Sequence, residues 1–283
     1  MLAGTMALTV RELKKWIRTP PLVFTALFQP LVWLALFGNA FNPTNLVPNI
    51  SIPGVNLDTI RQSILTQTFG GAPNYITYLT GGILCLILLF NAAFSGMSIV
   101  FDRRFSILNA LLAAPIPRTS IFLSRVLSSV VKGMIQAVVI FGLALVIPNG
   151  LRLAPGFNGL DLLGVFSVMF LLAFGFASMF TAISIRIAKW ETLIAVVNLL
   201  NLPLLFASSA LLPISSMPDW LQMVAKVNPI SRAAETARIF IVQGSINATD
   251  MSTVVFDVSF LVGFALLFTI VGVLASRLAL RAE

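Results

Sequence analysis

The chain consists of long apolar runs separated by short polar segments. The six runs cover residues 22–41, 75–100, 130–148, 160–185, 192–212 and 254–276. Crossing a hydrocarbon core of about 30 Å takes about 20 helical residues. The alternation of apolar and polar residues that marks a barrel strand is missing from these runs. The pattern therefore predicts an all-α polytopic membrane protein with six transmembrane helices.

The segment before the first run, residues 1–21, has a different pattern. Four apolar residues recur at helical spacing, and five charged residues lie largely opposite them: Met6, Val10, Leu13 and Ile17 against Arg11, Glu12, Lys14, Lys15 and Arg18. This pattern predicts an amphipathic helix lying on the membrane surface. The alternative is a positively charged flank that only fixes the orientation of the chain.

Two long segments connect runs on the opposite side of the membrane. Residues 42–74 are rich in Pro, Gly, Asn and Thr, so we expect turns there rather than a packed domain. Residues 213–251 alternate apolar and polar positions at helical spacing from Trp220 to Val242, with a break at Asn228 and Pro229. This second pattern predicts a re-entrant pair of short helices that dip into the outer face of the membrane and return.

Composition and charge support a membrane protein and indicate its orientation. Hydrophobic residues make up 58% of the chain and charged residues only 10%, which a soluble fold could not accommodate. Thirteen of the 18 Lys and Arg fall on the side of the N-terminus, and five fall on the other side: Arg61, Arg152, Lys226, Arg232 and Arg238. The positive-inside rule then makes both termini cytoplasmic. The net charge of +8 lies in short clusters, which argues against a nucleic-acid surface.

Several kinds of chemistry find no support in the sequence. The chain has no histidine and a single cysteine, Cys85, and it has no glycine-rich phosphate loop. We therefore expect no catalytic residues, no metal site and no ATP site. Polar residues inside the runs are candidates for a translocation path or, alternatively, for contacts between helices: Gln29, Asn91, Asn198 and Asn201. Lys132, at the start of the third run, is expected to extend to the inner surface, and an ion relay is the alternative.

The polar segment after the second run, residues 101–118, places charges ahead of leucines, as a short docking helix would. The alternative is a solvated turn. The segment also resembles the cytoplasmic coupling segment of type-2 permeases of ATP-binding-cassette (ABC) exporters, including the daunorubicin-resistance kind. The resemblance implies contacts with an ATPase from Phe101, Asp102, Arg103, Arg104, Phe105, Leu108, Leu111, Leu112, Pro115 and Arg118. Family members often carry an acidic residue near Arg104 and glycine near Ser106, where this chain departs from them.

Two further stretches resemble the same family. One runs from Arg11 to Pro30, and the other, from Phe206 to Phe240, resembles the re-entrant outer segment. In the second stretch the resemblance implies an outer gate formed by Pro213, Pro218, Trp220, Asn228, Pro229, Arg232, Glu235 and Arg238. The spacing of Arg232, Glu235 and Arg238 places these three residues on one helical stripe.

The resemblance implies a function for the whole chain. Residues 1–283 would form one permease domain of a multi-pass prokaryotic plasma membrane protein. It would pair with a second permease copy or a close homologue and with a cytoplasmic ATPase that binds ATP and Mg. The apolar composition suits an amphipathic drug-like or lipid-like cargo. The alternatives are a polysaccharide or glycolipid exporter, an ATP-independent secondary transporter and a membrane scaffold. A secondary transporter would be expected to carry paired intramembrane charges, which are not evident in the sequence.

Overall fold

The computed structural model describes residues 2–40, 63, 68–147, 150–244 and 248–279. Across these ranges the regular structure is helical and contains no strand, which confirms the all-helical prediction. Most of the outer segment 42–74, for which we expected turns, lies outside the described residues.

Each predicted apolar run corresponds to one long helix. These helices are α2 (Pro20–Ala40), α4 (Tyr75–Arg104), α6 (Arg118–Val146), α7 (Gly159–Arg186), α8 (Trp190–Phe206) and α11 (Ala248–Ala279). By length and composition α4, α6, α7 and α11 are able to cross a membrane, whereas the apolar parts of α2 and α8 are shorter.

The third and fifth runs differ from their helices at one end. Helix α6 begins at Arg118 rather than at Val130, because Ile121, Phe122 and Val126 continue its buried face toward the N-terminus. Hydropathy missed this extension since it also contains Arg125, which is buried with partners of its own. Helix α8 ends at Phe206 rather than at residue 212, three residues after an internal proline.

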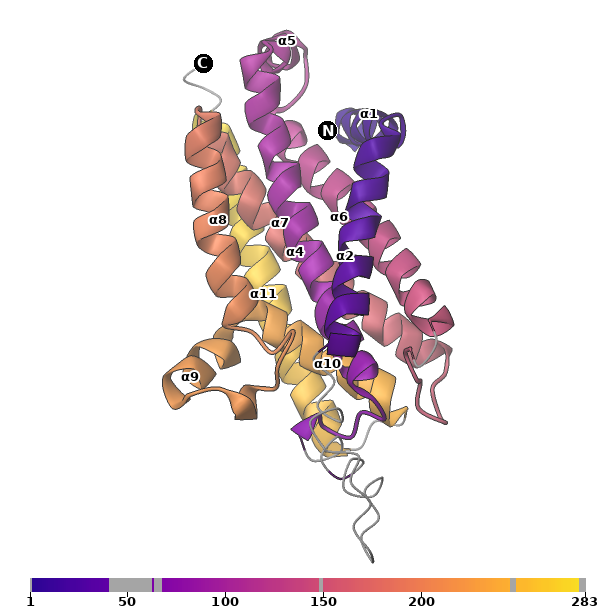
Figure 1. Cartoon of the computed structure of the whole chain (residues 1–283). Coiled ribbons are helices and arrows are strands. Elements are labelled where there is room, and N and C mark those ends of the chain that lie inside the picture. The colour runs from indigo at the N-terminus through magenta and orange to yellow at the C-terminus, as the bar shows by residue number, and fades with distance from the viewer. Residues whose placement is uncertain (1, 41–62, 64–67, 148–149, 245–247, 280–283) are drawn as a thin grey trace, which may run out of the picture.

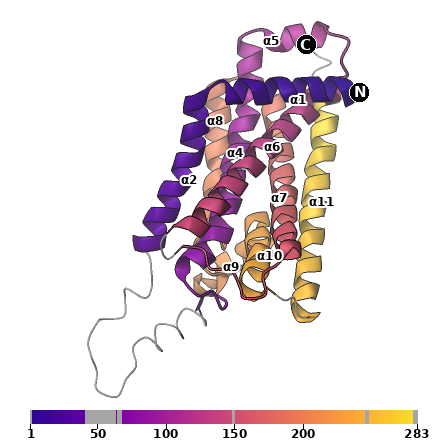
Figure 2. The ribbon, with the colours of Figure 1, turned by 90° about the vertical axis from the view of Figure 1, so that its right-hand side faces the viewer.

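The helices form a bundle around α4 and α7. Helix α7 contacts α4, α6, α10 (Pro229–Gln243) and α11, while α2 packs on α4 and α6, and α8 packs on α4. Figure 2 shows α1 (Leu2–Ile17) lying across one end of the bundle, the end that also carries α5 (Ile107–Ala113) and the last turns of α11. Helices α9 (Asp219–Val227) and α10 lie at the opposite end (Figure 1). The predicted coupling segment and the predicted outer segment are therefore at opposite ends of the molecule.

Two glycines allow other parts of the chain to approach α4 closely. A Cβ atom on Gly82 would lie 1.8 Å from the carbonyl oxygen of Ala210, and one on Gly96 would lie 2.9 Å from that of Phe180. Neither position tolerates a side chain without movement of backbone. Small residues of this kind let membrane helices pack tightly where apolar burial supplies little driving force.

Helix α1 packs on the bundle through a face that the sequence did not indicate. Thr5, Leu8, Thr9 and Glu12 are its buried residues, while apolar side chains such as Met6 remain exposed. The exposed apolar side chains agree with a helix that contacts lipid at the membrane surface. The placement of Glu12 on the charged, exposed face was wrong, because this side chain is buried against α6.

Candidate functional site

A cavity of about 680 Å³ is lined by residues of α1, α2, α4, α6 and α8. Three of the four translocation candidates line it from three different helices: Gln29, Asn91 and Asn198. Asn91 also donates hydrogen bonds from its side-chain amide to the carbonyl and hydroxyl oxygens of Ser129 on α6. Asn201 does not line the cavity, and its buried Oδ1 atom has no hydrogen-bond partner in the described structure.

The wall of this cavity is mostly apolar and rich in aromatic rings. The aromatic members are Trp16, Trp33, Phe90, Phe94, Phe101 and Trp190. A small number of amides and hydroxyls are interspersed, and Lys132 is the single charged residue among the described lining residues. A largely apolar wall with a few polar groups is the usual composition of a small-molecule site. The space therefore suits a molecule with an apolar body and one polar part.

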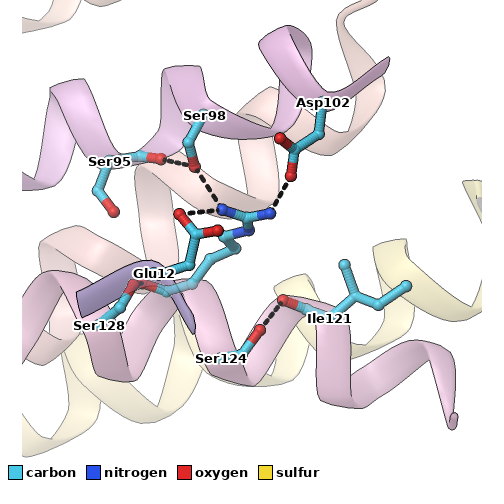
Figure 3. A network of polar contacts seen from close by, with 8 residues as sticks. Glu12, Ser95, Ser98, Asp102, Ile121, Ser124 and Ser128 are labelled. Atoms are coloured by element: carbon cyan, nitrogen blue, oxygen red, sulfur yellow. Dashed lines mark hydrogen bonds and ion pairs between the residues drawn. The ribbon is translucent and has the colours of Figure 1, made fainter. Parts of the chain in front are cut away.

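A buried charge network lies next to this cavity, toward the end of the bundle that carries α1. The guanidinium of Arg125 on α6 forms ion pairs with Glu12 of α1 and Asp102 of α4 (Figure 3). It also donates a hydrogen bond of 3.2 Å to Ser98, which lines the cavity. All three charged side chains are at most 5% exposed. The network therefore ties the surface helix α1 to the end of α4 and to the cavity wall.

The predicted coupling segment begins inside this structure. Phe101 lines the cavity, and its ring centroid lies 4.2 Å from that of Trp190 at the start of α8. Arg103 donates hydrogen bonds to the carbonyl oxygens of Ile185 and Ile187, at the C-terminal end of α7. Cations at this position satisfy the free carbonyls of a helix end. Part of the segment that we expected to contact an ATPase thus has partners within the chain.

The rest of the coupling segment forms a separate short helix. Ser106 has a left-handed backbone with φ of 57°, a conformation that favours glycine, and the turn there separates α4 from the seven residues of α5. Leu108 is buried with Leu8 and Ile121, so α5 is fixed against α1 and α6. Against this cluster lie the half-buried Leu111 and Leu112. Exposed residues of the segment are Arg104, Phe105 and Pro115, whereas Arg118 is half-buried at the start of α6.

At the opposite end, Arg238 of α10 holds three elements together. Its side chain donates to the carbonyl oxygens of Tyr78, Ser209 and Ala210, and its guanidinium lies 3.6 Å from the centre of the Tyr78 ring. These contacts join α10 to α4 and to the turn that follows α8. Arg238 is therefore a buried structural anchor of the outer segment.

The predicted break between the two outer helices is present. Asn228 accepts a hydrogen bond from the backbone of Ile230 and donates to the carbonyl oxygens of Leu204 and Ala207, while Pro229 occupies the first turn of α10. A capping side chain followed by proline is a usual helix start. Pro213 is buried, whereas Pro218 and Trp220 are exposed. The structure thus contains the two short helices; their depth in a membrane remains a prediction.

The stripe of Arg232, Glu235 and Arg238 is not a chain of ion pairs. Arg232 pairs with Asp257 of α11 at 3.0 Å, and Arg238 bonds to carbonyl oxygens as described above. Glu235 is half-buried and has no ion pair in the described structure. Burial raises the pKa of the Glu235 carboxyl above its usual range, and the charge of Arg238 opposes this shift.

Sequence reasoning selected Asp102 and Arg232 but missed other members of their ion pairs. Glu12, Arg125 and Asp257 were not candidates, although each forms an ion pair in the structure. One signal was available, because charged residues inside or beside apolar runs are usually paired. Their partners come from helices far apart in the sequence, so spacing alone could not assign them.

Comparison with known proteins assigns the family. The sequence model of the ABC-2 type transporter family matches residues 4–242. The chain belongs to this family. It is therefore a multi-pass membrane permease of the ABC transporter class, and the resemblance noted in the sequence is confirmed.

Similar proteins carry two kinds of name. The ycf38 protein of Pyropia yezoensis, named as a transport permease, is 36% identical over 80% of this chain and 69% of its own length. DrrC of Mycobacterium tuberculosis, named as a doxorubicin resistance ABC transporter permease, is 27% identical over 69% of this chain and 71% of its own. DrrB1 of Streptomyces coeruleorubidus, named as a daunorubicin resistance permease, is 22% identical over 73% of this chain and 72% of its own.

Proposed function

We propose that this chain is the membrane-spanning subunit of an ABC exporter that moves an amphipathic drug-like or lipid-like molecule. A separate ATPase subunit, which binds ATP and Mg, would supply the energy, and this chain would contribute no ATPase site. Family membership and the drug-resistance names of DrrC and DrrB1 support the proposal. So does the apolar, aromatic cavity, whose composition is usual for a site that binds a small molecule with an apolar body.

One observation carries the mechanism: the cavity and the predicted coupling segment share Phe101. In addition, Ser98 lines the cavity while it accepts a hydrogen bond from Arg125, whose partner Asp102 begins the charged part of the segment. Movement of α5 by an ATPase would therefore be transmitted to the cavity wall through a short path of packed and ion-paired side chains. Packed elements of this kind shift between discrete arrangements rather than deform smoothly.

The proposal includes a topology and an assembly. The chain would cross the membrane six times, with α2 and α8 as the shorter spans, with both termini in the cytoplasm and with α9 and α10 in the outer face. Helices α2 and α8 both border the cavity, so a second permease copy placed against them would close it. A paired permease above two ATPases would then alternate between inward-open and outward-open states.

Reconstitution tests this function. The chain and its cognate ATPase are expressed together, purified by a tag on the ATPase and placed in proteoliposomes that contain a fluorescent amphiphile. We expect copurification and ATP-dependent movement of the amphiphile, unaffected by ionophores that collapse proton and sodium gradients. Movement driven by an ion gradient without ATP would instead identify a secondary transporter. Transport of a polysaccharide but of no amphiphile would contradict the proposed cargo.

A further inference from the structure

Lys132 occupies a position that differs from the expected one. Since α6 begins at Arg118, Lys132 is in the middle of the helix and two turns beyond Arg125. Two turns of α-helix rise about 10 Å, so its backbone lies deeper in the bundle than the network around Arg125. Its side chain lines the cavity, and Gln136, one turn further along the same face, lines it too.

The charge of Lys132 has no direct partner in the described structure. The ion pairs of Arg125 engage Glu12 and Asp102, and none of the described ion pairs includes Lys132. The charges of Glu12, Arg125 and Lys15 influence Lys132, but none of the described ion pairs joins these residues to it. The described cavity wall contains no acidic side chain. An unpaired charge at membrane depth is costly and usually marks a functional position.

We infer that Lys132 binds an anionic group of the cargo, such as a carboxylate, phosphate or sulfate, while the apolar body of the cargo lies against the aromatic wall. This inference rests on the proposed function, and it narrows the cargo to acidic amphiphiles. The amide of Gln136 and the hydroxyl of Ser95 line the same cavity and are suitable donors to the remaining oxygens of such a group. Aromatic faces also attract cations, so a basic amphiphile is the competing cargo.

The positions of the tryptophans provide a direct binding assay. The chain has four tryptophans, and Trp16, Trp33 and Trp190 line the cavity, whereas Trp220 is exposed on α9. In a Trp220→Phe background, energy transfer from tryptophan to a dansyl group reports occupancy of the cavity. The probes are dansylamino-undecanoic acid, its uncharged methyl ester and the corresponding undecyl amine, each titrated against the purified complex of permease and ATPase.

We expect the carboxylate probe to bind about tenfold more tightly than the ester, because the ester lacks one charge-assisted contact with Lys132 and such a contact changes affinity by about this factor. Lys132→Gln should remove this preference and leave the affinity for the ester within about twofold of the wild-type value. Lys132→Arg should keep the preference. Lys226→Gln, at an exposed lysine of α9, is the matched control and should change neither value. Equal affinity for all probes, tighter binding of the amine, or an unchanged preference in Lys132→Gln would overturn the inference.

Two additional experiments distinguish the source of the acidic group and the role of the Lys132 charge. Competition by phosphatidylglycerol or by a free fatty acid shows whether the acidic group belongs to a membrane lipid or to a smaller amphiphile. If Lys132 only balances the charge of Glu12, the Glu12→Gln/Lys132→Gln variant will bind and export the carboxylate probe like wild type, which would also overturn the inference. ATP-driven export of the ester without any preference for the acid would refute the inference alone, whereas no export of any probe would refute the proposed function.

Discussion

Replacement of Arg125 by methionine would disrupt the buried network that joins α1, α4 and α6. The substitution keeps the length and apolar character of the side chain but leaves the carboxylates of Glu12 and Asp102 without their cation. Each carboxylate already has one buried oxygen without a hydrogen-bond partner in the described structure. The variant would therefore hold two uncompensated charges in an environment that water scarcely reaches.

The expected loss of stability is large. Removal of one partner from a buried ion pair costs about 3 to 5 kcal/mol, because the other charge remains buried and unpaired. Neutralising all three residues together, as Glu12→Gln/Asp102→Asn/Arg125→Met, should recover most of that loss, since apolar or neutral replacements of whole buried networks are often close to neutral. The triple variant should nevertheless couple poorly, because its α1 and α4 are no longer joined through a common cation.

Two measurements check both parts. Thermal unfolding of the purified complex in detergent compares the stabilities of the variants. We expect the triple variant to be nearly as stable as wild type, and Arg125→Met to be much less stable than either. Cargo moved per ATP hydrolysed gives the coupling, which we expect to fall in the triple variant. Arg186→Gln, at an exposed arginine near the end of α7, controls for loss of an arginine. An Arg125→Met chain as stable as wild type, or a triple variant with full coupling, would refute this reasoning.

The remaining predictions concern the two ends of the bundle. Arg104→Glu should leave thermal stability unchanged and weaken copurification of the ATPase. Arg103→Glu should instead lower stability by about 1 to 3 kcal/mol, because two carbonyl oxygens lose their donor. Equal effects of the two substitutions in both assays would contradict this distinction. Glu235→Gln should reduce cargo efflux at matched membrane levels, and wild-type efflux would contradict a role of this half-buried carboxyl group in export. Arg238→Met should destabilise the outer segment by several kcal/mol, seen as faster proteolysis from outside, because three buried carbonyl oxygens lose a charged donor. A cysteine at Asn109, which is exposed, should be labelled only from the cytoplasmic side, and the buried native Cys85 should add no background; labelling from outside would reverse the topology.

The helices could be predicted from the sequence because apolar periodicity and length are local properties. The limits of the runs failed where a buried polar or charged residue interrupts hydropathy, as Arg125 does near the start of α6. A short helix in the segment 101–118 was also predicted, from charges placed ahead of leucines, and α5 lies there after a left-handed turn at Ser106 that the sequence did not predict.

The site was predicted only in part. Polar residues such as Gln29, Asn91 and Asn198 could be selected as unusual at membrane depth, and the structure brings them to one cavity. The internal roles of Arg103 and Arg238 could not be predicted, because their acceptors are backbone carbonyls of distant segments, which leave no mark in the sequence.

Blocking the cavity tests most directly whether ATP-driven cargo passes through it. Asn198→Trp places a large side chain in the wall, whereas Leu266→Trp adds the same group at an exposed position of α11 away from the cavity. In proteoliposomes that contain the permease and its ATPase, we predict that Asn198→Trp abolishes ATP-dependent amphiphile movement while ATPase association is retained, and that Leu266→Trp transports like wild type. Undiminished transport by the Asn198→Trp complex would contradict the assignment of this cavity as the path.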